Sequence, residues 1–279
     1  TTQLFDWIKD KSIDDKSRIA LLVGNAGVGK SVILRDLFKL LEGNGIPVLG
    51  IKVDKLFNIQ SNKEIENGLN LGGDPTAIFQ SLSSKYPIVT LLIDQIDALS
   101  QSLSSERHAI NAYDRFIKQI NLLPNVRIII SCRTYDLRYD PTLRSYMGKK
   151  IFHVSSLSIN QVKNVIAELK LFVNEANDRL LEFLRIPLHL KLLAKIGHDV
   201  EFGDNITLQK LYDEIWNEYI AGSSAVNSDK IISLLSSIAR SMNEQQQIVV
   251  DKRQYDVQNK ELSYLLHNDL LQESTSNKI

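Results

Sequence analysis

This sequence has almost no cysteine, no net charge and no long apolar run. Cys132 is the only cysteine, so no disulfide can form within the chain and no cysteine-based metal spacing is present. A reducing, cytoplasmic setting is therefore expected. Lys and Arg total 33, as do Asp and Glu, which leaves no global field that favours nucleic acid or membrane. No apolar run approaches the roughly 20 residues that a membrane helix needs, so no membrane partner is expected.

The composition is that of an ordinary globular protein, with 43% hydrophobic and 24% charged residues. A chain of 279 residues exceeds the size at which single cores usually stop growing, which favours two or three modest domains. The chain begins at Thr1, without an initiating methionine or a signal-peptide pattern. We therefore expect it to be part of a longer polypeptide.

Apolar runs of strand length alternate with helical patterns through the first half of the chain. This alternation predicts an α/β fold, a parallel sheet with helices on both faces. A polar, glycine-containing segment at 58–73 is expected to be a loop or an irregular insert. The expected strands are 19–23, 46–53, 88–93, 126–131 and 151–154, and the expected helices are 31–41, 74–85 and 106–122.

The strand pattern nearly vanishes after residue 155, and the remainder is expected to be mainly helical. A lone strand candidate at 248–250 between two helices indicates a winged-helix-like segment. We expect three domains: a P-loop core at 1–156, a small helical lid at 157–205, and a winged-helix-like domain, incomplete here, at 206–279. The expected helices are 158–171, 174–184, 187–196, 208–220, 229–242 and 262–271.

One segment matches the phosphate-binding pattern G-x-x-x-x-G-K-[ST] in full, between an apolar strand and an amphipathic helix. Its glycines allow backbone N–H groups to converge on an anion, and the helix dipole adds positive potential. Lys30 is expected to reach the β- and γ-phosphates of ATP or ADP, and the Ser31 hydroxyl to ligate Mg²⁺. The alternative is a glycine-rich turn without a ligand. The predicted nucleotide-binding residues here are Gly24, Asn25, Ala26, Gly27, Val28, Gly29, Lys30, Ser31 and Val32.

Two carboxylates follow the most apolar run of the chain, in the sequence Asp94-Gln95-Ile96-Asp97. An acid at the end of a buried strand beyond a P-loop is where a Walker B aspartate belongs, so Asp94 is expected to hold the magnesium. Asp97 is a candidate to orient the attacking water or act as general base. Otherwise Asp94 is a strand-end cap and Asp97 a helix N-cap.

Polar residues also end the strand expected at 126–131. Such residues face the ligand crevice in a parallel sheet, so Ser131 or Arg133 is expected to sense the γ-phosphate, Arg133 by a charge-assisted hydrogen bond. The alternative is a surface arginine paired with Asp136 or Asp140. Cys132 lacks an identifiable partner base and is interpreted as a packing residue.

A fourth segment, Arg185-Ile186-Pro187-Leu188-His189-Leu190, opens a helix with proline at its first position. The five histidines show no metal-ligand spacing and are interpreted as ordinary.

Four motifs stand in one order along the chain: the P-loop, the D-Q-I-D strand end, the S-C-R strand end and the I-P-L-H-L helix. This ordered set resembles the signal-transduction ATPases with numerous domains (STAND), and the NACHT-like ATPases among them.

The resemblance spans residues 5–193 and is weaker beyond. It implies an AAA-related core, a helical domain and a winged helix, in which nucleotide state governs self-association and fused effector and sensor domains respond. It makes Asp94 the Walker B acid, Arg133 the sensor and Pro187 the residue that packs against adenine. Bacterial members of this kind commonly act in antiphage defence.

The sequence departs from that family at three places. Ala98 stands where a second acid often follows, which suggests slow hydrolysis. Arg185 replaces a usual glycine, and the histidine that grips the β-phosphate in many relatives has only His267 as a weak counterpart.

Three other functions stay open at the level of sequence. An origin-recognition-like AAA+ ATPase would bind DNA through a basic recognition helix, yet 261–271 contains no Lys or Arg. A small-molecule kinase would need an acceptor pocket and an arginine-rich lid. A nucleotide-binding interaction module with little turnover would be compatible with Ala98.

Overall fold

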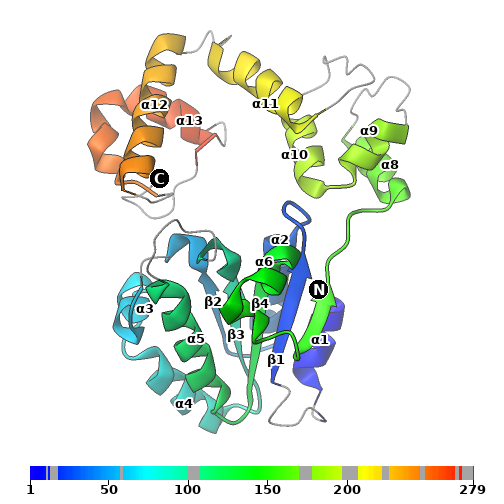
Figure 1. Cartoon of the computed structure of the whole chain (residues 1–279), viewed down its shortest axis with the longest axis vertical. Coiled ribbons are helices and arrows are strands. Elements are labelled where there is room, and N and C mark those ends of the chain that lie inside the picture. Colours follow the sequence, from blue (N-terminus) through cyan, green and yellow to red (C-terminus); the bar gives the residue numbers. More distant parts are fainter. Residues whose placement is uncertain are drawn as a thin grey trace. The chain divides into compact units, whose positions relative to one another are not determined.

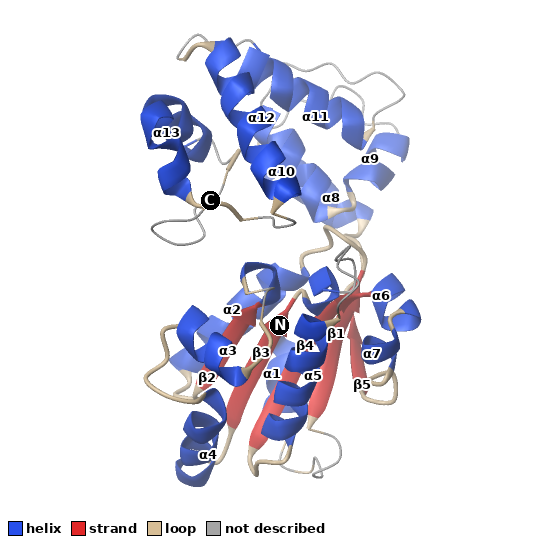
Figure 2. Cartoon of the chain, turned by 60° about the vertical axis from the view of Figure 1, so that its left-hand side comes forward, coloured by secondary structure: helices blue, strands red, loops and turns tan. Residues whose placement is uncertain are grey.

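The computed structural model describes residues 1–10, 12, 18–56, 59–99, 107–169, 178–196, 207–221, 226–245, 249–267, 270–271 and 279. These residues fall into two compact units, Thr1–Ser155 and Ser156–Ile279. The first unit is built around a β-sheet, and the described elements of the second are almost entirely helical (Figures 1 and 2).

The first unit contains a five-stranded, fully parallel sheet in the order β2-β3-β4-β1-β5. The strands are β1 (Ile19–Gly24), β2 (Val48–Lys52), β3 (Val89–Asp94), β4 (Val126–Arg133) and β5 (Lys150–His153). Every strand expected from the sequence in this unit is present, with ends that differ by at most two residues. The predicted parallel α/β fold is therefore confirmed, and β4 lies between the strand that precedes the P-loop and the strand that ends in Asp94.

Helices cover both faces of this sheet (Figure 2). Along β1, Leu21 and Val23 pack on the face covered by α4 (Pro75–Lys85) and α5 (His108–Asn121). Ala20 and Leu22 point to the other face, covered by α1 (Thr2–Lys9) and α2 (Lys30–Gly43). Because alternate side chains of a strand point to opposite faces, a strand that is apolar at every position must be covered on both.

The predicted helices of the first unit are present, but the expected loop over 58–73 is wrong in part. Within it, Asn62–Gly68 form a helix, α3. The Glu64 carboxylate accepts hydrogen bonds from the backbone N–H groups of Gln60 and Ser61 and so satisfies donors that a helix start leaves unpaired. The signal was the pair of Ser61 and a glutamate three residues later, which the local glycines and polarity obscured.

Two short helices that the sequence did not predict, α6 (Thr134–Tyr139) and α7 (Pro141–Arg144), connect β4 to β5. α6 begins immediately after Arg133. The Asp140 side chain caps α7 by accepting hydrogen bonds from the backbone N–H groups of Thr142 and Leu143.

The second unit contains helices α8 (Ile159–Glu168), α9 (Asp178–Leu184), α10 (Pro187–Ile196), α11 (Leu208–Trp216), α12 (Ser228–Glu244) and α13 (Asn259–His267). A π-helical turn follows α11 at Asn217–Ala221, and a 3₁₀ helix precedes α13 at Lys252–Gln258. All six expected helices are present. The expected ends at Leu171 and Asn174 lie outside the described residues, and α13 begins three residues earlier than expected, so it includes Lys260.

Buried residues of the second unit form two apolar clusters. One joins α8 through α11 and the other joins α12, α13 and the residues around them. Val250 and Ile279 exchange both of their backbone hydrogen bonds, at 2.9 and 3.1 Å. Of the strand candidate at 248–250, residue 248 lies outside the described part, and only this bridge is seen. The winged-helix interpretation stays a prediction.

None of the helices in the described parts of the chain combines the length and the apolar character needed to traverse a bilayer.

Candidate nucleotide-binding site

The candidate site residues of the first unit gather at one edge of the sheet, where the carboxyl ends of β1, β4 and β3 lie side by side. The P-loop leaves β1 at Gly24, Arg133 ends β4 directly opposite Gly24, and Asp94 ends β3. In open α/β sheets ligands bind outside the carboxyl ends of the strands. The topology therefore brings three motifs from distant parts of the sequence to one place.

Two glycines of the P-loop have backbone conformations that other residues seldom adopt. Gly27 has φ of 75° and Gly29 has φ of 97°. At Gly24 the requirement is steric, because a Cβ atom there would lie 2.7 Å from the carbonyl oxygen of Val154. The motif thus has glycine where the tight turn between β1 and α2 needs it.

Lys30 begins α2 and is nearly buried, with an exposed fraction of 8%. Its ammonium Nζ donates hydrogen bonds to the carbonyl oxygens of Gly24 and Asn25, at 2.8 and 2.9 Å. Burial lowers the pKa of Lys30, an effect that the carboxylate of Asp97 opposes. The lysine therefore spans the loop as a buried cation whose partners are neutral carbonyls, which an anionic ligand can replace.

The two predicted magnesium ligands, Ser31 and Asp94, are joined by a chain of three hydrogen bonds. The Gln95 amide Nε2 donates to the Ser31 hydroxyl at 3.1 Å, and the Gln95 backbone N–H donates to the Ser131 hydroxyl at 2.8 Å. Ser131 in turn donates to Asp94 Oδ1 at 2.5 Å. Ser131 is completely buried, so it acts between Asp94 and Gln95.

The residues at this edge fit a magnesium ion that arrives with a nucleotide. A hydroxyl and a carboxylate are hard oxygen ligands of the kind Mg²⁺ prefers, and Mg²⁺ is usually held by one or two carboxylates together with phosphates and water. No group of three or more His, Cys, Asp or Glu side chains within the described residues is arranged to hold a metal ion. Ser31 and Asp94 would hold Mg²⁺, whose chemistry there is to neutralise charge on the phosphates.

Asp97 and Arg133 form an ion pair, with 3.0 Å between Asp97 Oδ2 and Arg133 Nε. Asp97 lies in a 3₁₀ turn, Ile96–Leu99, and its side chain is 5% exposed, whereas that of Arg133 is 44% exposed. Burial raises the pKa of Asp97, and the Arg133 guanidinium opposes this. Neither Asp136 nor Asp140, the partners that the surface alternative required, forms this pair.

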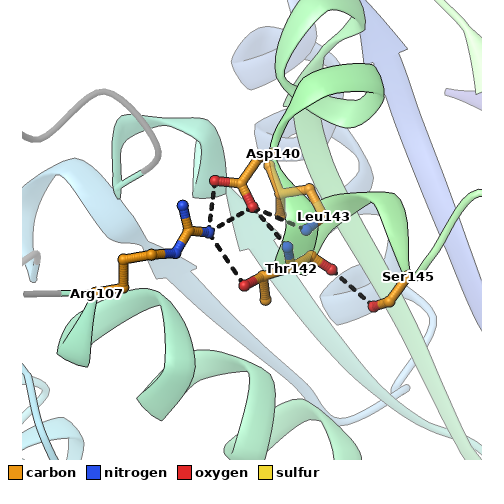
Figure 3. Close-up of polar contacts among 5 residues, drawn as sticks. All are labelled: Arg107, Asp140, Thr142, Leu143 and Ser145. Carbon is orange, nitrogen blue, oxygen red and sulfur yellow. Dashed lines mark hydrogen bonds and ion pairs between the residues drawn. The ribbon is translucent and has the colours of Figure 1, made fainter.

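Asp140 is instead the partner of Arg107, at the beginning of α5 (Figure 3). Arg107 Nη2 lies 2.7 Å from both carboxylate oxygens of Asp140 and also donates to the Thr142 hydroxyl at 3.1 Å. Since Asp140 is 6% exposed and caps α7, this cluster ties the segment after Arg133 to α5. Sequence reasoning assigned no role to Arg107, because nothing local pairs it with Asp140.

Gln95 is the residue at the site that the sequence interpretation missed. It lies between the two candidate acids and has φ of 59°, a left-handed conformation that is uncommon outside glycine. Its side chain contacts a P-loop residue that is distant in the sequence. The hint in the sequence was its position at the end of the most apolar strand.

Pro187 and His189 belong to the second unit. Pro187 is the first residue of α10, as the sequence predicted, and its contact with adenine stays a prediction. His189 stacks on Phe183 with 4.1 Å between ring centroids, and its Nδ1 lies 2.7 Å from the Phe183 carbonyl oxygen. These contacts make His189 a packed helix residue. His198 lies outside the described residues.

Comparison with solved structures identifies several similar chains at low identity. A DNA replication initiation factor has 16% identity and a TM-score of 0.46, over 87% of this chain and 70% of that one. AMPPCP-bound DnaA from Aquifex aeolicus has 16% identity and a TM-score of 0.44, over 85% and 69%. Cdc6p from Pyrobaculum aerophilum has 14% identity and a TM-score of 0.42, over 99% and 86%. TM-scores of this size say nothing about function. A comparison with curated proteins found no match to the chain.

Comparison with protein families gives a more specific result. The family described as "ATPase family associated with various cellular activities (AAA)" matches residues 20–154. This span begins within β1 and ends just after β5, so it contains the P-loop, Asp94, Asp97 and Arg133. Domains of this family in general bind and hydrolyse nucleotides. Residues 20–154 are therefore an AAA domain, a nucleotide-binding module with the P-loop ATPase fold.

Proposed function

We propose that the chain is an ATP-binding, Mg²⁺-dependent NTPase that works as a nucleotide-controlled switch and hydrolyses ATP slowly. The observation behind this proposal is the ion pair between Asp97 and Arg133 at the P-loop edge of the sheet. Arg133 is the half-exposed cation at the end of β4, opposite Gly24. A γ-phosphate would compete with Asp97 for its guanidinium, whereas ADP would not.

A switch requires a contact that differs between the two nucleotide states. In the structure, Arg133 is paired with Asp97. With ATP, the γ-phosphate becomes a second anionic partner for Arg133. The guanidinium then takes the position of the stronger contact, either with the γ-phosphate or with Asp97. With ADP, the pair with Asp97 persists. The position of Arg133 therefore reports the presence of the γ-phosphate, and α6, which begins at the next residue, receives that change directly.

Slow turnover follows from the groups that are available to accept a proton. Gln95 is a neutral amide and is no general base. Asp97 is a carboxylate, but it is buried and paired with Arg133. Its pairing with Arg133 competes with its use as a base, and this competition limits the rate. Ala98, which follows it, has no acidic group.

The remaining features of the proposal rest on the resemblance to NACHT-like members of the STAND class. In this proposal Pro187 contacts adenine, residues 157–205 form a lid, and residues 206–279 form part of a winged helix. ATP promotes self-association in the cytoplasm, and effector and sensor domains on the same polypeptide respond to it in antiviral defence. α13 contains one Lys or Arg, Lys260, next to Glu261, which gives no support to a DNA-binding function.

The experiment that tests the proposal measures nucleotide affinity and self-association on the same 279-residue chain. Calorimetry with Mg²⁺ should show tighter binding of ATP than of ADP. Sedimentation velocity should show a larger species with a non-hydrolysable ATP analogue than with ADP. Equal affinities together with an unchanged sedimentation coefficient would reject the switch. No binding of either nucleotide would reject the nucleotide-binding role altogether.

A further inference from the structure

The contacts of Gln95 suggest a role that deepens the proposed function. We propose that Gln95 is a positioning residue for the magnesium site: it orients the Ser31 hydroxyl and links it to Asp94. This inference rests on the proposed binding of Mg-ATP. It concerns how the chain obtains its magnesium dependence, and it assigns Gln95 no part in proton transfer.

The first step of the argument is the orientation of the Ser31 hydroxyl. A serine hydroxyl has one donor hydrogen and two acceptor lone pairs. The Gln95 amide occupies one lone pair from a distance of 3.1 Å, which leaves the second for a metal ion. An otherwise free rotor is thereby restricted to orientations in which its remaining lone pair is available. Groups that hydrogen-bond to metal ligands in this way commonly change metal affinity by about 10- to 100-fold.

The second step is the anchoring of Gln95 itself. Its backbone N–H donates to Ser131, whose hydroxyl donates to the other predicted ligand, Asp94. Gln95 donates in two directions, through its side-chain amide to Ser31 and through its backbone N–H to Ser131, so the two ligands are held through one continuous set of bonds. Ser131 is fully buried and has little freedom to reorient. The hydrogen bonds therefore connect Ser31 on α2 to Asp94 at the end of β3 through Gln95 and through Ser131 on β4.

The third step is the backbone conformation of Gln95. A left-handed conformation is strained for a non-glycine residue, and such strain persists where surrounding contacts maintain it. At φ of 59° the backbone N–H faces Ser131 while the side chain reaches Ser31. If only the turn mattered, glycine would suit this position better. Glycine could not make the contact with Ser31 that the Gln95 amide makes.

Two substitutions separate the side chain from the backbone. Gln95→Met keeps the length of the side chain and removes the amide donor. Gln95→Gly removes the side chain and accepts the left-handed backbone without strain. Gln80→Met makes the same chemical change at an exposed position on α4 and serves as the control.

The measurement is the affinity for ATP with Mg²⁺ and, separately, with EDTA. For the wild type and Gln80→Met, Mg²⁺ should strengthen binding. For Gln95→Met and Gln95→Gly that enhancement should fall about tenfold, while affinity in EDTA stays within about twofold of the wild type. A residue needed only for folding would weaken binding equally under both conditions.

Three outcomes distinguish the two proposals. If both Gln95 variants keep the full magnesium enhancement, the positioning role is wrong and the nucleotide switch is unaffected. If they lose affinity equally in Mg²⁺ and in EDTA, Gln95 supports the fold and the positioning role is again wrong. If the wild type binds ATP without any magnesium enhancement, both the positioning role and the magnesium dependence of the switch are rejected.

Discussion

Arg133 is bonded to Asp97 through Nε at 3.0 Å, at the edge of the sheet where the P-loop begins. The carboxylate is buried and the guanidinium is half-exposed, so the pair has one fixed member and one that is able to move. Its position at a strand end predicts that Arg133 senses the γ-phosphate. The ion pair with Asp97 supplies the contact with which a γ-phosphate would compete. Release from Asp97 is the event that a γ-phosphate would promote.

We expect Arg133→Ala to narrow the difference between ATP and ADP affinities. A hydrogen bond to a charged group contributes about 1.5–3 kcal/mol, which corresponds to a loss of roughly tenfold or more in ATP affinity. ADP affinity should change little. Calorimetry with both nucleotides measures this directly, and an unaltered ATP-to-ADP ratio would leave Arg133 with a structural role only.

For Asp97→Asn we expect a gain in thermal stability near neutral pH. Burial raises the pKa of Asp97 above its ordinary value of 3.8 despite the opposing effect of Arg133, so folding disfavours its ionised form. A raised folded-state pKa means that the contribution to stability is present below the unfolded pKa and is lost as pH rises through the folded pKa. The advantage of Asp97→Asn should therefore shrink as pH falls toward 3.8.

Melting curves of the wild type and of Asp97→Asn across this pH range provide the measurement. Arg133, being half-exposed, remains solvated when its partner is neutral. A variant that is less stable than the wild type at pH 7 would show that the ion pair outweighs the cost of burial, contrary to this expectation.

Lys30→Ala should weaken ATP binding at least about tenfold, because it removes the cation nearest the predicted phosphate site. Lys39→Ala, at an exposed position on the same helix, is the control for a loss of positive charge. Since Lys30 bonds to two P-loop carbonyls, circular dichroism of the variant should be recorded alongside. Equal ATP affinity in all three proteins would contradict the P-loop assignment.

Hydrolysis by this chain should be slow, well below the typical enzyme rate of about 10 per second, and should require Asp94. Asp94→Asn keeps the size of the side chain while weakening its interaction with magnesium. A phosphate-release assay on both proteins measures the effect. Turnover at a typical rate in the wild type would conflict with a restrained switch.

The Arg107–Asp140 pair allows a prediction about stability rather than nucleotide binding (Figure 3). Asp140→Ala should lower the free energy of unfolding by about 1–3 kcal/mol, because the buried N–H of Leu143 loses its acceptor. Arg107→Ala should cost less, about 1 kcal/mol or below, since its side chain is partly exposed. Urea unfolding of both variants measures the two losses of unfolding free energy. A loss for Arg107→Ala equal to or larger than that for Asp140→Ala would refute this prediction.

Much of the first unit was predictable because its signals are local. Each strand is a short apolar run, and each predicted helix has a start or stop residue beside it, such as Asp74, which accepts a hydrogen bond from Ala77 at the beginning of α4. The helix over Asn62–Gly68 was missed although its capping residues are local too, since polarity and glycine outweighed them. α6 and α7 are too short to show an amphipathic period.

What the sequence determined by itself is the phosphate-binding turn: its glycines permit the positive φ angles at Gly27 and Gly29 whatever surrounds them. It also determined that buried strands would end in polar residues. Only the tertiary structure decided which of those residues meet. The partners of Arg133, Gln95 and Arg107 come from other strands or helices. No local sequence pattern specifies the order of the strands in the sheet, so these partners could not be predicted. Because β4 lies between β1 and β3, Arg133 meets Asp97, and Ser131 connects Asp94 to Gln95 and so to the P-loop.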